Sequence, residues 1–134
     1  MNSFVVSLQT ELSKHFETVR VSSMQTQDQL LQEIRAINPD KLPGIIIVFD
    51  DMQLLSSEGI QELRFTLIAV AKFTASSSEK ALAAFSCVDK LLEIFPADGR
   101  MIGEMFVHPT DCVAASPAAN YAAFALGITS KKGF

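Results

Sequence analysis

One stretch of the sequence, residues 42–49, restricts the possible folds more than any other. It reads Leu-Pro-Gly-Ile-Ile-Ile-Val-Phe, a continuous apolar run rich in β-branched side chains. Such a run is typical of a strand covered on both faces, because successive side chains of a strand point to opposite sides of its sheet. We therefore expect a central strand here, with other elements packed on the sheet.

A second long strand is predicted over residues 62–74, apolar on one face and mixed on the other. The segment that joins the two strands, residues 50–59, reads Asp-Asp-Met-Gln-Leu-Leu-Ser-Ser-Glu-Gly. It is long for a tight hairpin turn and contains three bulky apolar residues. The sequence thus predicts a hairpin with an unusually apolar connection.

Helical periodicity of the apolar residues predicts helices over residues 3–18 and 76–95, and a short amphipathic helix between them whose apolar stripe covers residues 30–37. Thr26 or Asp28 is expected to cap the second helix, and Ser76 with Glu79 has capping-box spacing for the third. Weaker strand patterns cover residues 19–23, 101–107 and 112–115, with a loop at residues 108–111, and a clearer one covers residues 121–129. Residues 131–134 are expected to form a solvated tail.

These elements predict a single α+β domain over residues 1–134. The expected architecture is a sandwich, a mostly antiparallel sheet with its helices packed largely on one face. A chain of 134 residues, 49% of them hydrophobic, can bury a core of its own. Cys87 and Cys112 are therefore expected to be free thiols rather than a disulfide staple.

The charge balance excludes some kinds of partner. With 11 basic and 15 acidic residues the net charge is −4. This argues against specific nucleic-acid binding and against an anionic membrane surface, because both rely on Lys and Arg. The longest uncharged stretch, residues 112–130, contains Pro117 and Asn120, so we expect no transmembrane helix.

Two groups of residues deserve consideration as chemical sites. His108, Asp111 and Cys112 bring a base, an acid and a thiol together in sequence, but adjacent residues of an extended chain point to opposite faces. Asp50 and Asp51 follow a buried strand, a position where acids hold metals or act as bases in α/β enzymes, yet a hairpin favours a solvated strand end.

Metal and nucleotide motifs are missing from the sequence. The two His and two Cys, at positions 15, 87, 108 and 112, lack the close pairing of a zinc site. The six glycines form no phosphate-binding loop. We therefore expect a non-enzymatic protein with no catalytic, metal or cofactor site.

The apolar residues of the hairpin connection point instead to a surface. Met52, Leu54 and Leu55 stand in a polar context, flanked by Asp50, Asp51 and Glu58. Two interpretations remain open: a neighbouring subunit covers these residues, or they fold back onto the protein's own sheet. We take these six residues as a candidate subunit or partner interface.

The overall pattern resembles the tail-terminator-like proteins of long-tailed bacteriophages, especially the tail-completion proteins of Mu-like phages and prophages. The likeness covers nearly the whole chain and rests on apolar and turn patterns rather than on chemical signatures. The segments that carry it are residues 4–12, 42–49, 64–70, 76–95 and 121–126.

The resemblance implies a virion structural protein, made in the host bacterial cytoplasm and placed in the virion tail. Such subunits form a homo-oligomeric ring, commonly a hexamer, at the head-proximal end of the tail tube. The ring stops tube polymerisation and docks the head-tail connector protein, so the implied partners are further copies of the chain, the tail-tube protein and the connector. The alternative is a small intracellular dimeric α+β module that binds a ligand or acts as a regulator.

Overall fold

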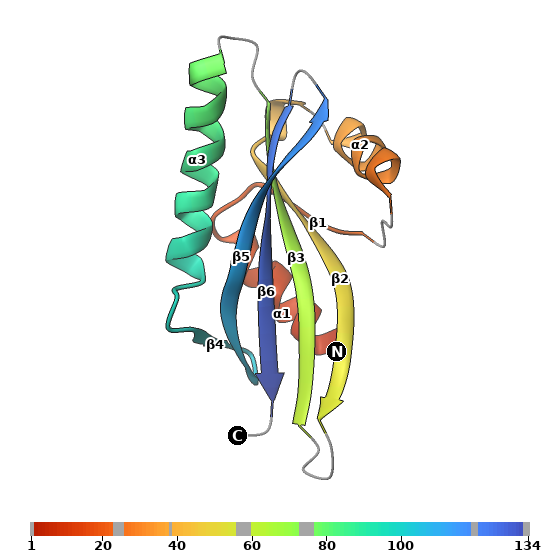
Figure 1. Ribbon diagram of the computed structural model, residues 1–134, viewed down its shortest axis with the longest axis vertical. Coiled ribbons are helices and arrows are strands. Elements are labelled where there is room, and N and C mark those ends of the chain that lie inside the picture. Colours follow the sequence, from red (N-terminus) through yellow and green to blue (C-terminus); the bar gives the residue numbers. More distant parts are fainter. Residues whose placement is uncertain are drawn as a thin grey trace.

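The computed structural model describes residues 2–22, 26–37, 39–55, 60–72, 77–118 and 121–132. In these residues the chain forms three α-helices, one short 3-10 helix and six strands (Figure 1). The helices are α1 (Asn2–Ser13), α2 (Gln27–Ala36) and α3 (Ser77–Ile94), and the 3-10 helix is η1 (Pro39–Lys41). The strands are β1 (Thr18–Ser22), β2 (Gly44–Leu55), β3 (Ile60–Lys72), β4 (Arg100–Ile102), β5 (Met105–Ala118) and β6 (Tyr121–Lys132).

The strands form one mixed sheet in the order β1-β2-β3-β6-β5-β4. β1 runs parallel to β2, and the other neighbouring pairs are antiparallel. The long strands β2, β3, β5 and β6 twist along their length, as Figure 1 shows. The predicted fold class, a mostly antiparallel α+β domain, is confirmed.

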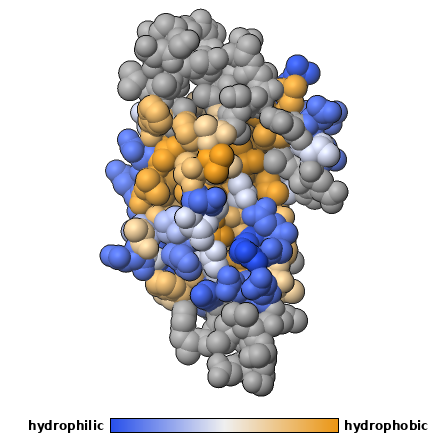
Figure 2. Space-filling model, viewed as in Figure 1, coloured by the Kyte–Doolittle hydropathy of each residue, from blue (hydrophilic) through white to orange (hydrophobic). Residues whose placement is uncertain are grey.

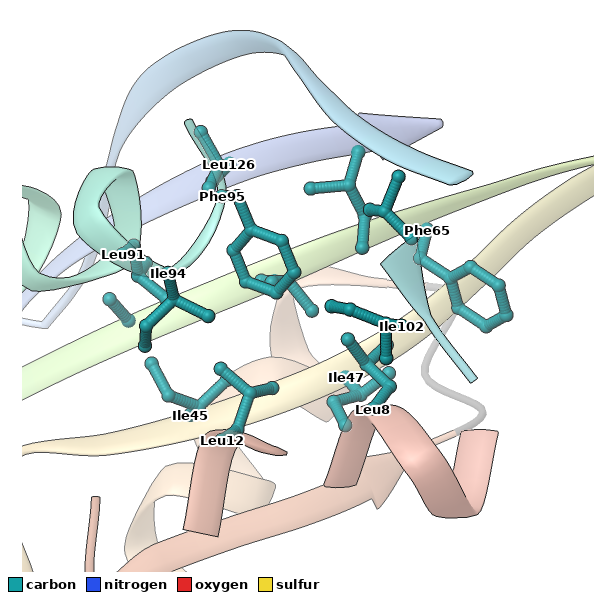
Figure 3. Packing of buried hydrophobic residues seen from close by; sticks show 14 of the residues in the cluster. Leu8, Leu12, Ile45, Ile47, Phe65, Leu91, Ile94, Phe95, Ile102 and Leu126 are labelled. Carbon is teal, nitrogen blue, oxygen red and sulfur yellow. The ribbon is translucent and has the colours of Figure 1, made fainter. Parts of the chain in front are cut away.

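The central isoleucine run explains how the sheet is covered. Ile45 and Ile47 point into the larger core cluster, which lies between the sheet and helices α1 and α3, whereas Ile46 points into a smaller cluster beneath α2. All three side chains are fully buried. Figure 3 shows Leu8 and Leu12 of α1 and Leu91 of α3 packed around Ile45 and Ile47. Two helices therefore cover one face, and the short α2 covers part of the other.

Several predicted strand boundaries were wrong, because the strands stay paired beyond the segments whose sequence has a strand pattern. β2 continues through Leu55, where we predicted a connection, since its residues stay paired with β3 across a register shift between Phe49 and Asp51. β5 runs unbroken through the predicted loop at residues 108–111, with a register shift between Pro109 and Asp111. Lys131 and Lys132 belong to β6 rather than to a tail.

The helix boundaries follow the sequence more closely. Thr26 caps α2 in a complete capping box: its hydroxyl accepts from the Gln29 amide, and its own amide donates to the Gln29 side chain. The cap predicted at Ser76 lies outside the described residues. α1 ends at Ser13, earlier than expected, and the turn at Asp98-Gly99 is confirmed, with Gly99 at φ +83°. Among the described residues, no helix combines the length and apolar character needed to cross a membrane.

Candidate functional site

The sheet face that carries α2 is only partly covered, and its uncovered portion is polar. The pairing register places His108, Thr129, Arg64 and Asp51 side by side across four strands. The next row holds Phe106, Lys131, Glu62 and Gln53. In Figure 2, hydrophilic residues accordingly gather over the lower half of the described surface, below a hydrophobic upper half.

These rows line an open groove with a volume of about 620 Å³, which we call the polar groove. Side chains from β2 and β3 line it on one side and those from β5 and β6 on the other. The polar residues that line it are Asp50, Glu62, Arg64, Thr66, His108, Thr110, Asp111, Thr129 and Lys131.

Cross-strand contacts hold the charged side chains of the groove in place. Arg64 Nε donates to Asp51 Oδ1 at 2.7 Å, and the Thr66 hydroxyl donates to Asp50 Oδ2 at 2.6 Å. Lys131 Nζ lies 3.8 Å from Glu62 Oε2. Exposed pairs of this kind contribute only about 0–1 kcal/mol each, so they align side chains more than they stabilise the fold.

Gly127 allows the β5 side of the groove to close over the sheet. A Cβ atom at this position would come within 2.7 Å of the Thr110 hydroxyl and would collide with the Asp111 carboxyl group. The Thr110 hydroxyl in turn donates to Asp111 Oδ1 at 3.1 Å. The absence of a side chain at residue 127 therefore lets Thr110 and Asp111 lie directly above the strand.

The residues predicted as an interface do not form one surface. Asp50 and Asp51 lie in or beside the polar groove, whereas Met52 pairs with the buried Leu63 and lies on the opposite face of the sheet. Leu54 and Leu55 pair with Gln61 and Ile60 through the backbone, but their side chains are outside the described part of the structure. Glu58 is outside the described residues altogether.

The structure does not bring the thiol of Cys112 together with His108 as a catalytic site would require. Cys112 pairs with Leu126 on the α1 side of the sheet, whereas His108 pairs with Thr129 on the groove side. Partial desolvation, reinforced by the Asp111 charge, raises the pKa of the Cys112 thiol, which is the wrong direction for a nucleophile. Both cysteines are free, Cys87 buried and Cys112 exposed.

Most residues of the polar groove were not predicted from the sequence. Arg64, Thr66, Thr129 and Lys131 were not singled out, although alternation of Glu62, Arg64 and Thr66 along one strand is the signal of a polar sheet face. Within the described ranges, no three His, Cys, Asp or Glu side chains are grouped so that they could hold a metal ion.

Comparison with known proteins does not identify a family for this chain. A scan against protein-family models finds no match, and a search of curated proteins finds no significant match. The case for a function therefore rests on the residues and their arrangement.

Proposed function

We propose that this chain is a non-enzymatic structural protein of a phage or prophage virion, a tail terminator that assembles as a ring at the head-proximal end of the tail tube. One observation carries the proposal: the β2–β3 hairpin extends beyond α1 and exposes apolar side chains on the core face of the sheet. Figure 1 shows both strands continuing past the helix. Phe49 is 37% exposed and Met52 is 44% exposed.

The exposed apolar side chains of the hairpin are continuous with the buried core. The ring of Phe49 lies 5.5 Å from that of Phe65, and Phe65 lies 5.6 Å from Phe4 of α1, measured between ring centroids. A line of aromatic contacts thus leads from the buried core to the surface at Phe49. An exposed apolar surface that continues a core is typical of one that a partner covers.

A ring accounts for such a surface in an acidic subunit. In a closed ring each subunit contacts its neighbours through two different patches, so more apolar surface is exposed in the single subunit than in the assembly. A net charge of −4 also suits a channel through which DNA passes without binding. The partners in this proposal are further copies of the chain, the tail-tube protein and the head-tail connector, met in the host cytoplasm and then in the virion tail.

The test is light scattering of the purified protein over a concentration series, with and without tail-tube protein, and negative-stain imaging of any large species. We expect closed rings, and we expect Met52→Asp to reduce their formation at least tenfold without changing the helix content. Met101→Asp is the matched control, because Met101 is similarly exposed, at 51%, but lies on β4. Equal assembly by both variants, or no ring under either condition, would contradict the proposal.

The polar groove favours a second candidate, a dimeric module that binds a small polar ligand. Its volume of about 620 Å³ lies within the range of small-molecule sites, and it presents Arg64 and Lys131 beside several carboxylates. Native mass spectrometry of gently purified protein should then show a dimer carrying an additional mass, which Arg64→Met removes. A ring without any additional mass would reject this candidate.

A further inference from the structure

We propose that neighbouring copies of this chain join edge to edge, the outer edge of β1 in one copy pairing with the outer edge of β5 in the next. This inference rests on the proposed ring and adds a pair of patches that the ring would bring together, besides the apolar surface at Phe49 and Met52. The sheet then continues from subunit to subunit.

Among the described strands, the outer edge of β5 has a partner only at its start, although α2 also contacts part of β5. β4 pairs only with residues Met105, Phe106 and Val107, and beyond them no strand of the described chain pairs with this edge. Asp111, Cys112, Val113 and Ala114 are all exposed, although they alternate between the two sheet faces. Val113 is 57% exposed. An edge of this kind, apolar apart from Asp111 and without a strand partner, is a ready template for another strand.

Helix α3 exposes apolar side chains beside this edge. The helix packs mainly against β3 and β6, so Phe85 remains 53% exposed while its ring lies 5.7 Å from Phe124 of β6. Ala114 of β5 pairs with Phe124, which places all three residues on one face. Leu92 extends the exposed stripe two turns further along α3. A strand added to β5 would therefore also gain apolar contacts.

The opposite end of the sheet offers a matching strand. β1 pairs only with β2, and in the described residues its other edge has no partner. Val21 is 51% exposed on this strand. Arg20 is half-buried and forms no ion pair within the described part of the chain.

The register places residues of opposite charge, one from each edge, on the same face of the sheet. Arg20, Ile46, Ile68, Ala125 and Val113 form one row across the sheet, so Arg20 lies on the same face as Val113 and Asp111. Val21 is in the row of Ile47, Leu67, Leu126 and Cys112. A continuous sheet would place Arg20 on the face of Asp111, and Val21 on the face of Cys112 and Phe85.

Symmetric pairing of β5 with β5 of a second copy would account for fewer of the exposed residues. It would leave the edge of β1 and its exposed Val21 uncovered, and it would bring no cation to Asp111. The β1-to-β5 contact covers both edges with one kind of interface, and a head-to-tail interface of this kind is what a closed ring requires.

The test uses Cys112, the exposed native thiol, as one half of a cross-link. Val21→Cys supplies the other half on the same face of the neighbouring copy, and a short bismaleimide joins thiols that are close together. Because each copy then carries one thiol at each edge, we expect a ladder of dimers, trimers and higher species. Val6→Cys, equally exposed but on α1, is the matched control and should give no ladder.

A charge reversal tests the pairing without any cross-linker. We expect Arg20→Asp to weaken assembly about tenfold, and the double variant Arg20→Asp with Asp111→Arg to restore it, as for opposite charges across an interface.

The outcomes separate this inference from the proposed function. Rings that give no ladder, or products that stop at a dimer, overturn the edge pairing and leave the ring proposal standing. A protein that stays monomeric alone and with tail-tube protein overturns both.

Discussion

At the scale of single residues, Glu11 connects elements that are distant in sequence. Its carboxylate accepts from Lys14 Nζ at 3.0 Å and lies 3.0 Å from Arg100 Nη2 of β4. Arg100 also donates to the Ile94 carbonyl at the end of α3. The Lys14 hydrogen bond and the positive charge of Arg100 hold the pKa of Glu11 below its ordinary value of 4.5, against the opposing effect of burial.

This depressed pKa predicts a definite acid response. The stabilisation by Glu11 is complete at pH values above 4.5 and is lost as the pH falls from there through the lower pKa of the folded state. Glu11→Gln should therefore lower the free energy of unfolding at pH 7 by at most about 1 kcal/mol and have less effect at the acid end. Urea titrations at several pH values measure this, with the exposed Glu17→Gln as control. An equal loss at every pH would show that the effect is not electrostatic.

At the scale of elements, α2 depends on its cap because it is short. Thr26→Ala removes the hydroxyl that accepts from the Gln29 amide and should cost about 1 kcal/mol of stability. Thr10→Ala is the control: Thr10 lies inside α1, where alanine is the better helix former, so the change should be neutral or slightly stabilising. Thermal unfolding followed by circular dichroism measures both, and equal effects of the two changes would contradict the capping argument.

At the scale of the whole molecule, the two core clusters share one sheet and should unfold together. Leu8 packs in the larger cluster and Ile34 in the smaller one, and both side chains are fully buried. Truncation of either to alanine should cost about 2–5 kcal/mol. Because Ile45, Ile46 and Ile47 join the clusters through one strand, we expect a single urea transition in each variant. A separate early transition in Ile34→Ala would show that α2 and its cluster unfold independently.

The sequence by itself determined the kinds of element and most of their positions. The run of Ile45, Ile46 and Ile47 specified a strand covered on both faces, and the candidate caps Thr26 and Asp28 limited where α2 begins, of which the structure uses Thr26. These features are local, since strand alternation and capping depend on residues a few positions apart.

Only the tertiary structure decided which residues share a face and where the strands end. Gly127, Thr110 and Asp111 meet because β5 and β6 pair with a shifted register, which no local pattern reveals. For the same reason the predicted interface at Asp50, Asp51 and Met52 divides between two faces. Strand order, which among the described strands leaves β1 and most of β5 without a partner on their outer edges, follows from long-range pairing and from how the helices cover the sheet.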